Sequence, residues 1–413
     1  MSATPTPPAP TPSAVGVLTV TMAVQALASG AMILPAVLGP VATPDYGIDS
    51  TAVGLYMALV YLAAMLTSVI GGSIVGRFGA MRCSQVSLLL CAAGLLLLAS
   101  AEPWLGVLGA LLIGVGYGPI TPASSFLLMR STPKDKLSLV FSIKQTGVPL
   151  GGVIAAVGGA VLESWVGWRV TLGLFAVAAL LCAFATEYYR ASLDTDKQAN
   201  TPVALLDLLR PVALVWKTPA LRIVAVCSLF FSFVQLAATA FLVTYLNLSL
   251  GWTLVMAGMM MSVTQVAGVV GRIGWGFVAD RWMSPRRLLA WLALLMAVSC
   301  LLTAALTPDS SVTWVAGVAA LYGVTAIGWN GVFLAEVARR APPGQAGRAT
   351  GGTLVYTYLG VLIGQPLFGG IAALGGPPGE PHYSLAYLMM MIPALCCAAW
   401  LFKSSRRARA VQS

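Results

Sequence analysis

The chain has 413 residues, of which 58% are hydrophobic and only 9% are charged. A soluble globular protein carries charge on about a quarter of its residues, so this composition excludes that class. The formal net charge of +10 could suggest a nucleic-acid partner, but the distribution of the charges along the chain favours a different explanation.

Apolar segments of about 20 residues recur along the whole chain, and each is long enough to cross the hydrocarbon core of a membrane as an α-helix. The sequence therefore predicts an all-α membrane protein with twelve transmembrane helices and both termini on one side. The predicted spans are 14–38, 51–75, 84–101, 104–129, 138–162, 166–189, 219–246, 252–279, 287–306, 311–338, 348–374 and 383–402.

The basic residues gather on one side of these spans. Twenty of the 23 Lys and Arg fall in even-numbered loops or the C-terminal tail, whereas Arg169 lies on the other side and Lys144 and Arg272 lie within spans. The positive-inside rule then places both termini in the cytoplasm, and we expect a multi-pass protein of the inner (plasma) membrane. The basic balance indicates topology, so no nucleic-acid partner is expected.

The longest polar segment divides the chain into two halves of six helices. Within that segment, residues 203–209 have the spacing of a helix that lies on the membrane surface. The predicted parts are a disordered cytoplasmic tail at 1–13, an N-terminal six-helix bundle at 14–189, a cytoplasmic linker at 190–218, a C-terminal six-helix bundle at 219–403 and a basic cytoplasmic tail at 404–413.

The two halves contain an internal repeat. The loop after the second span, GSIVGRFG, corresponds at an offset of 204 residues to GFVADRWM after the eighth, and Val24-Gln25 is echoed by Val234-Gln235. Two related bundles imply a binding site near mid-membrane at their interface. The residues of the repeated loop are Gly72, Arg77 and Gly79 in the first copy and Gly276, Asp280 and Arg281 in the second.

The repeated loop resembles the G-x-x-x-D-R-x-G-R-R motif of the major facilitator superfamily, and the likeness covers the chain apart from its tails. The second copy has Met283 in place of the glycine, with its last arginines shifted by two residues, and the first copy has Gly76 where the family has aspartate. The resemblance implies two pseudo-symmetric six-helix bundles that alternate access to a central site. It also implies that the loop residues act on conformation rather than on substrate.

In the fifth span, GVPLGG at 147–152 is similar to a glycine-proline motif often found in the family's proton antiporters, with the proline displaced by one residue. Pro149 predicts a kink, and Gly147, Gly151 and Gly152 predict close helix contacts. Any packed membrane helix can use Gly and Pro in this way, so both interpretations stay open.

Arg272 lies about 10 Å below the membrane surface by the helical rise per residue. It stands four residues before the motif glycine, a position at which oxalate and monocarboxylate transporters, which this chain resembles, bind a carboxylate. A guanidinium can donate two hydrogen bonds to one carboxylate. The alternative is that Arg272 braces its helix end by bonding to carbonyls or to Glu336. At the offset of 204 the first half has Ser68, so Arg272 breaks the repeat.

Lys144 lies roughly 9 Å inside the fifth span by the same measure. It could be the second cation of an anion site, or its long stem could carry the ammonium group to water. The resemblance also implies that polar and aromatic residues of the first, fourth, seventh and tenth spans line the cavity. These are Gln25, Tyr117, Gln235, Trp329 and Asn330, and each could instead form a hydrogen bond between helices.

No Walker sequence, serine-histidine-acid set or zinc spacing occurs, and we expect no enzymatic activity, no cofactor and no metal. The leading hypothesis is a secondary active transporter for a small, carboxylate-like organic anion, because the spans hold two cations and no deep acid. Coupling is either to a proton or by anion exchange, and we expect a monomer in the lipid bilayer. The alternatives are proton-driven efflux of apolar or cationic compounds, suggested by GVPLGG and the methionines at 256 and 259–261, and a transporter-like sensor that moves nothing.

Overall fold

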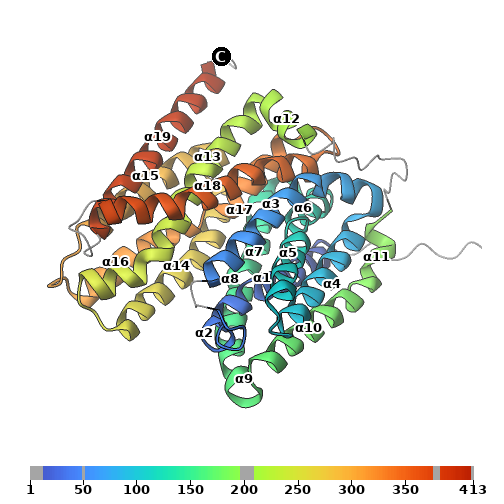
Figure 1. Ribbon diagram of the computed structural model, residues 1–413. Coiled ribbons are helices and arrows are strands. Elements are labelled where there is room, and N and C mark those ends of the chain that lie inside the picture. Colours follow the sequence, from blue (N-terminus) through green and yellow to red (C-terminus); the bar gives the residue numbers. More distant parts are fainter. Residues whose placement is uncertain (1–12, 49–51, 196–208, 375–381, 411–413) are drawn as a thin grey trace, which may run out of the picture. The chain divides into compact units, whose positions relative to one another are not determined.

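The computed structural model describes residues 13–48, 52–195, 209–374 and 382–410, and these are helical apart from turns and short connections (Figure 1). The helices before the long polar segment are α1 Ala14–Val37, α2 Gly39–Ala42, α3 Ala52–Phe78, α4 Ala80–Leu98, α5 Pro103–Tyr117, α6 Ile120–Ser131, the 3-10 turn η1 Lys134–Lys136, α7 Leu137–Gln145, α8 Gly147–Val153, the π-helix η2 Ile154–Gly158, α9 Gly159–Val166, α10 Trp168–Ala185 and α11 Glu187–Leu193. Those after it are α12 Leu209–Lys217, α13 Pro219–Thr244, the π-helix η4 Tyr245–Ser249, α14 Leu254–Arg281, α15 Pro285–Ala304, α16 Val312–Tyr322, the π-helix η5 Gly323–Ile327, α17 Asn330–Arg340, α18 Ala346–Leu374 and α19 Tyr383–Ala410.

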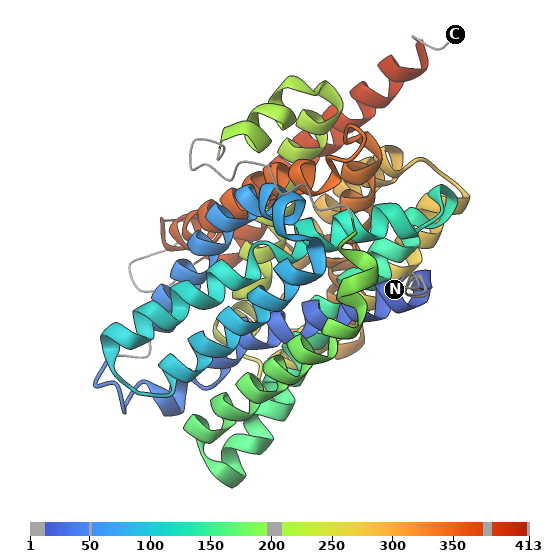
Figure 2. The ribbon, with the colours of Figure 1, turned by 90° about the vertical axis from the view of Figure 1, so that its right-hand side faces the viewer.

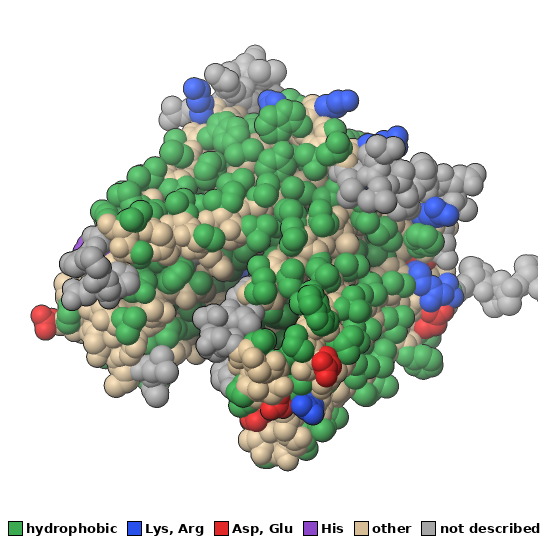
Figure 3. All heavy atoms as spheres, in the orientation of Figure 1, with side chains coloured by type: hydrophobic (Ala, Val, Ile, Leu, Met, Phe, Trp, Pro, Cys, Tyr) green, Lys and Arg blue, Asp and Glu red, His purple; other side chains and the backbone are tan. Residues whose placement is uncertain are grey.

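Twelve stretches of the described chain are long and apolar enough to cross a membrane. This confirms the predicted all-α class and the predicted number of spans. Apolar side chains cover most of the helical surface that Figure 3 shows, as expected of helices whose outer faces meet lipid. The fifth span, Lys134–Val166, is broken into η1, α7, α8, η2 and α9.

The chain divides by its internal contacts into two compact units. Unit 1 contains residues 1–132 and 150–208, and unit 2 contains residues 133–149 and 209–413. The division differs from the predicted bundles in one place, because the first half of the fifth span belongs to unit 2. The cause is packing, since α7 lies against α14 and α17.

In unit 1, α4 packs against α5 and runs beside α10 (Figure 2). A Cβ atom on Gly94 of α4 would lie 2.6 Å from the carbonyl oxygen of Gly109 on α5, so only glycine allows the two backbones to come this close. Leu88, Leu95 and Ile113 are fully buried around this crossing. They belong to a larger cluster of buried apolar residues that forms the core of the unit.

In unit 2, the main helix pairs are α13 with α18 and α15 with α19, which run side by side in Figure 1. The Ser232 hydroxyl on α13 donates to the carbonyl oxygen of Thr357 on α18 (2.7 Å). The Tyr245 hydroxyl lies 3.1 Å from the carbonyl oxygen of Thr303 and 3.1 Å from the Ser384 hydroxyl. Side-chain hydrogen bonds of this kind tie helices together where lipid leaves little hydrophobic driving force for association.

The structure describes parts of the predicted linker and of the predicted C-terminal tail, and both parts are helical. Residues 190–193 continue α11 and residues 209–217 form α12, so the linker is partly helical. The predicted surface helix at 203–209 lies outside the described residues, except for Leu209, which begins α12. At the C-terminal end α19 continues to Ala410, so 404–410 is helical rather than a separate tail. Residues 1–12 and 411–413 also lie outside the described part.

Candidate functional site

Two buried cations of unit 2 meet at the residue Gln145. Lys144 Nζ donates to Gln145 Oε1 (3.1 Å), and Arg272 Nη1 donates to the backbone oxygen of Gln145. Lys144 is 1% exposed and Arg272 is 4% exposed. The ammonium group of Lys144 is therefore hydrogen-bonded within unit 2 in this conformation. It does not reach water, which was the alternative suggested by the length of its side chain.

The contacts continue from Arg272 to the tenth span. Arg272 Nε donates to the carbonyl oxygen of Ile327 (3.0 Å), and Asn330 Nδ2 lies 3.5 Å from the same oxygen. Asn330 Nδ2 also donates to Gln235 Oε1 (3.4 Å), which accepts a second hydrogen bond from Trp329 Nε1 (2.9 Å). We call the connected set the unit 2 polar network; its members are Lys144, Gln145, Arg272, Ile327, Trp329, Asn330 and Gln235.

The π-helix η5 supplies one carbonyl group of this network, that of Ile327, and a second carbonyl group beside it. A π turn displaces the regular helical hydrogen bonds and is often found at functional sites. Arg272 donates to Ile327 in η5, and Trp275 Nε1, also from α14, donates to the carbonyl oxygen of Val324 (2.8 Å). Gly271 permits the approach, because a Cβ atom there would lie 2.6 Å from the Val324 oxygen.

Arg272 forms carbonyl contacts of the kind expected for a brace, but Glu336 is engaged elsewhere. Glu336 is 1% exposed; its Oε1 accepts a hydrogen bond from Arg340 Nε (2.9 Å) and lies 3.2 Å from Arg286 Nε. Asp280 likewise pairs with Arg339 Nη2 (2.7 Å). Both carboxylates therefore have cationic partners of their own.

Gln25 and Tyr117 belong to unit 1, and Gln25 forms a contact equivalent to that of Gln235. Gln25 Oε1 on α1 accepts from the Thr121 hydroxyl on α6 (3.4 Å), and its Nε2 lies 3.3 Å from the Ser29 hydroxyl. Span one is thus bonded to span four, as span seven is bonded to span ten through Gln235. Tyr117 is half-buried at the end of α5.

The second copy of the loop motif holds the first turn of α7. Asp280 accepts hydrogen bonds from the backbone N–H groups of Ser138 (3.0 Å) and Leu139 (2.7 Å). The first N–H groups of a helix lack partners within the helix, and a carboxylate there is also favoured by the helix dipole. Gly276 packs against Ser142 of α7, whereas Arg281 is exposed at the end of α14.

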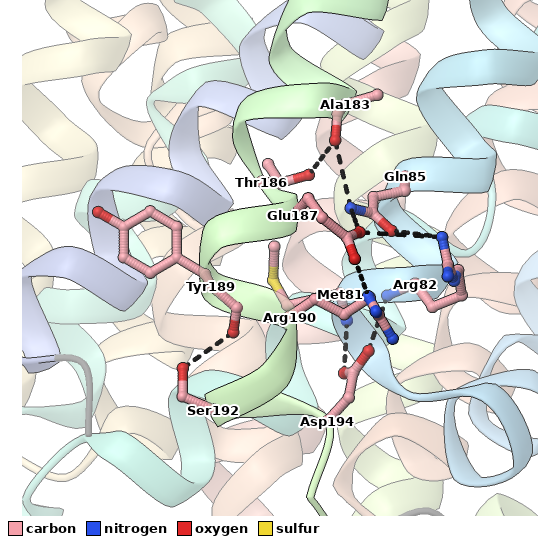
Figure 4. A network of polar contacts seen from close by, with 10 residues as sticks. All are labelled: Met81, Arg82, Gln85, Ala183, Thr186, Glu187, Tyr189, Arg190, Ser192 and Asp194. Atoms are coloured by element: carbon pink, nitrogen blue, oxygen red, sulfur yellow. Dashed lines mark hydrogen bonds and ion pairs between the residues drawn. The ribbon is translucent and has the colours of Figure 1, made fainter. Parts of the chain in front are cut away.

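The first copy of the motif is completed by a residue outside it, Asp194. Asp194, just after α11, accepts hydrogen bonds from the N–H groups of Met81 (2.9 Å) and Arg82 (3.0 Å) at the start of α4 (Figure 4). Gly79 has a φ of 95°, and a Cβ atom there would lie 2.5 Å from Asp194 Oδ2. Glycine is therefore required at position 79 by both backbone conformation and space.

The rest of the first copy makes fewer contacts. Gly72 is half-buried in α3, and Arg77 is exposed with its guanidinium 5.3 Å from the centre of the Phe78 ring. The capping role of Asp194 has one weak signal in the sequence. Asp194 lies seven residues after Glu187, which stands at the end of the sixth span.

A second set of polar contacts joins α4 to α11 beside Asp194 (Figure 4). Gln85 Nε2 donates to Glu187 Oε2 (2.8 Å), and Arg190 Nε donates to Glu187 Oε1 (2.6 Å). The hydrogen bonds from Gln85 and Arg190 lower the pKa of the Glu187 carboxyl. These hydrogen bonds stabilise the ionised carboxylate in the folded protein. Their contribution to the stability of the fold is therefore lost as pH falls through the lowered pKa.

Replacement of Asp194 by alanine is expected to lower the free energy of unfolding by about 1–2 kcal/mol, the usual cost of losing a helix cap. The measurement is thermal unfolding of the purified protein, followed with a thiol-reactive dye that reports exposure of buried cysteines such as Cys83 and Cys91. Asp309→Ala, at an exposed loop position, is the matched control. Equal melting temperatures for the two variants would contradict the capping role.

The GVPLGG segment contains the point along the chain at which unit 2 gives way to unit 1. Pro149 ends the first of the two segments of unit 2, and Leu150 begins the second segment of unit 1. A Cβ atom on Gly151 would lie 2.8 Å from the backbone nitrogen of Gly30 on α1, and one on Gly152 would lie 3.3 Å from Ile33 Cδ1. Gly147 begins α8, directly after the break at Thr146.

A family model described as Major Facilitator Superfamily matches residues 19–365. The chain belongs to the major facilitator superfamily. Its membership agrees with the twelve candidate spans and makes it a multi-pass membrane protein.

The relatives that this chain resembles carry different names. An uncharacterized MFS-type transporter of Mycobacterium tuberculosis is 26% identical over 278 residues, which are 67% of this chain and 60% of that relative, so the chain spans less than two thirds of its length. The gentisate transporter of Corynebacterium glutamicum is 24% identical over 79% of this chain and 74% of its own. A multi-drug resistance efflux pump homolog of Lactococcus lactis is 29% identical, over 32% of this chain and 33% of its own.

The superfamily fold is also found in solved structures. The human organic anion transporter MFSD10 (TETRAN) superposes with a TM-score of 0.76 at 16% sequence identity, covering 94% of this chain and 100% of that one. At this identity the likeness establishes the two-bundle helical fold and leaves the substrate to be argued from the site.

Proposed function

We propose that the protein is a secondary active transporter that moves a small organic anion by alternating access of its two halves. The observation that carries the proposal is the burial of Lys144 and Arg272 in one polar network of unit 2. Placing a cation in a membrane span costs at least about 2.5 kcal/mol, and such residues commonly mark a substrate or ion path. Two of them joined through one residue attract an anion strongly in a low-dielectric interior.

The surroundings of the network support an anionic substrate. The acids Asp280 and Glu336 of unit 2 have Arg339, Arg340 and Arg286 as partners. A bound carboxylate would bring negative charge to Lys144 and Arg272. The planar guanidinium of Arg272 suits the two oxygens of a carboxylate.

The relative named as a gentisate transporter makes an aromatic carboxylate the first substrate to test. We further propose an inner-membrane location with both termini in the cytoplasm, on the distribution of Lys and Arg. The transporter acts as a monomer and couples to a proton or exchanges anions.

The test is counterflow of labelled gentisate into proteoliposomes that contain the purified protein. Saturable uptake is expected, with competition by other small carboxylates and none by the methyl ester of gentisate, which lacks the charge. Uptake no greater than in protein-free liposomes across a panel of carboxylates would reject the proposal.

Efflux of apolar compounds is a second candidate, because unit 1 contains an apolar cavity of about 260 Å³. Its lining includes Leu38, Leu59 and Trp168, and the Tyr56 hydroxyl at its wall donates to the carbonyl oxygen of Met32 (2.9 Å) rather than facing the space. Dye accumulation in cells that produce the protein separates the candidates. Lower accumulation of apolar dyes, without carboxylate uptake in proteoliposomes, would favour efflux.

A further inference from the structure

The orientation of the Gln235 amide is determined by its neighbours. The indole N–H of Trp329 can only donate a hydrogen bond, so the atom of Gln235 that faces it at 2.9 Å must be the acceptor Oε1. Asn330 Nδ2 is directed at the same oxygen. The donor group Nε2 of Gln235 therefore points to the opposite side of the amide.

The Asn330 amide is oriented in the complementary sense. Its Nδ2 faces Gln235 Oε1 (3.4 Å) and the carbonyl oxygen of Ile327 (3.5 Å), so Oδ1 points away from both. Within the described part of the chain, Gln235 Nε2 and Asn330 Oδ1 form no hydrogen bond. Both residues are partly exposed, whereas Val234 and Trp329 beside them are at most 1% exposed.

The depth of these amides in the membrane decides what they face. Gln235 is near the middle of the span Pro219–Ser249, and Asn330 lies well inside the span Val312–Arg340. A polar group that faces hydrocarbon without a partner is costly, so irregular or polar surface at this depth occurs where it lines a water-filled cavity. We infer from this that the two amides present one donor and one acceptor to such a cavity.

We propose that Gln235 and Asn330 recognise a hydroxyl group of the transported anion and make the transporter selective for hydroxylated carboxylates. This rests on the proposed function. A hydroxyl both donates and accepts, so it can accept from Gln235 Nε2 and donate to Asn330 Oδ1, whereas an ionised carboxylate can only accept.

The hydroxyl end and the carboxylate end of the proposed site are neighbours in the structure. The carbonyl oxygen of Ile327 accepts from Arg272 Nε and lies within 3.5 Å of Asn330 Nδ2. One carbonyl oxygen of η5 therefore links the cation to the amide pair, so a small molecule with a carboxylate and a hydroxyl on one ring has the length to reach from one to the other. Trp329 positions Gln235 and is not a substrate contact, because Phe231 stacks on it at 4.9 Å and Phe333 packs at 5.2 Å.

The test compares benzoate with its 2-, 3- and 4-hydroxy derivatives as competitors of labelled gentisate in proteoliposomes. We expect at least one hydroxybenzoate to compete at least tenfold better than benzoate, about the effect of satisfying one otherwise unpaired buried group. Gln235→Glu keeps an oxygen toward Trp329 and replaces the donor Nε2 by an acceptor. In this variant the hydroxyl loses the group from which it accepts but can still donate to Asn330 Oδ1, so the preference ratio should fall. Because the added charge acts on every anion alike, the ratio is insensitive to that charge.

Gln345→Glu, at a half-exposed position in the connection before α18, is the matched control and should keep the preference. Asn330→Leu is the second variant, and its preference should also fall while benzoate still competes. Equal competition by benzoate and all three hydroxybenzoates in the unaltered protein, or a preference unchanged in Gln235→Glu, would overturn the inference and leave anion transport standing. Absence of any saturable carboxylate uptake would overturn the proposed function as well.

Discussion

Replacing Arg272 with alanine is expected to weaken the apparent affinity for a carboxylate at least about thirtyfold. Truncating one partner of a buried, hydrogen-bonded charge pair costs about 2 kcal/mol or more in binding free energy. Each factor of ten in affinity corresponds to about 1.4 kcal/mol, which gives the thirtyfold figure. Arg272→Lys keeps the charge but loses the planar pair of donors, so its affinity should lie between those of the alanine variant and the unaltered protein. The measurement is the KM for gentisate in counterflow at equal amounts of reconstituted protein.

The alternative role of Arg272 as a brace predicts a different pattern. Its hydrogen bonds to Ile327 and Gln145 hold α14 to η5 and α7, and losing only these would lower the melting temperature and the transport rate with KM unchanged. Arg222→Ala, at a half-buried arginine whose guanidinium lies 5.4 Å from the centre of the Trp216 ring, is the control for loss of an arginine. An Arg272→Ala variant with normal KM would remove this residue from the substrate site.

Replacing Gly276 with alanine is expected to destabilise the protein by about 1–3 kcal/mol, the cost of overpacking a filled contact. A Cβ atom at 276 would lie 2.6 Å from Ser142 Oγ, 2.7 Å from Ser142 Cβ and 2.9 Å from Leu139 Cα, so α7 must move away. Gly274, on the same helix, has nothing within 4 Å of the equivalent position. Gly274→Ala should therefore be neutral or stabilising, since alanine has the higher helix propensity.

Thermal unfolding with the thiol-reactive dye measures both glycine variants, and counterflow rates show whether the displaced α7 impairs transport. Ser142→Gly in the Gly276→Ala background removes two of the three clashing atoms and should restore part of the lost stability. Equal melting temperatures for Gly276→Ala and Gly274→Ala would show that the contact between α7 and α14 is looser than the structure indicates.

Several features of the candidate site were predictable as residues but not as an arrangement. Lys144 and Arg272 are evident in the sequence because a charge within an apolar run is rare, and Gln235 is evident from the repeat. The contacts of Arg272 with Gln145 and Ile327 were not predictable, because both of its acceptors are backbone carbonyls, which any residue type could supply. Asp194 was missed for the related reason that helix capping from a residue 113 positions away has no local pattern.

The sequence by itself determined the all-α membrane class, the twelve spans and the repeated loop. These depend on the length and spacing of apolar segments, because each segment must satisfy its own backbone hydrogen bonds in the bilayer. Only the tertiary structure decided that α7 belongs with α14 and α17, that Asp280 and Asp194 cap different helices, and that the amides of Gln235 and Asn330 point as they do. Such features depend on distances between segments far apart in the chain and on which backbone groups a π turn leaves available. No local pattern in the sequence indicates those distances or those backbone groups.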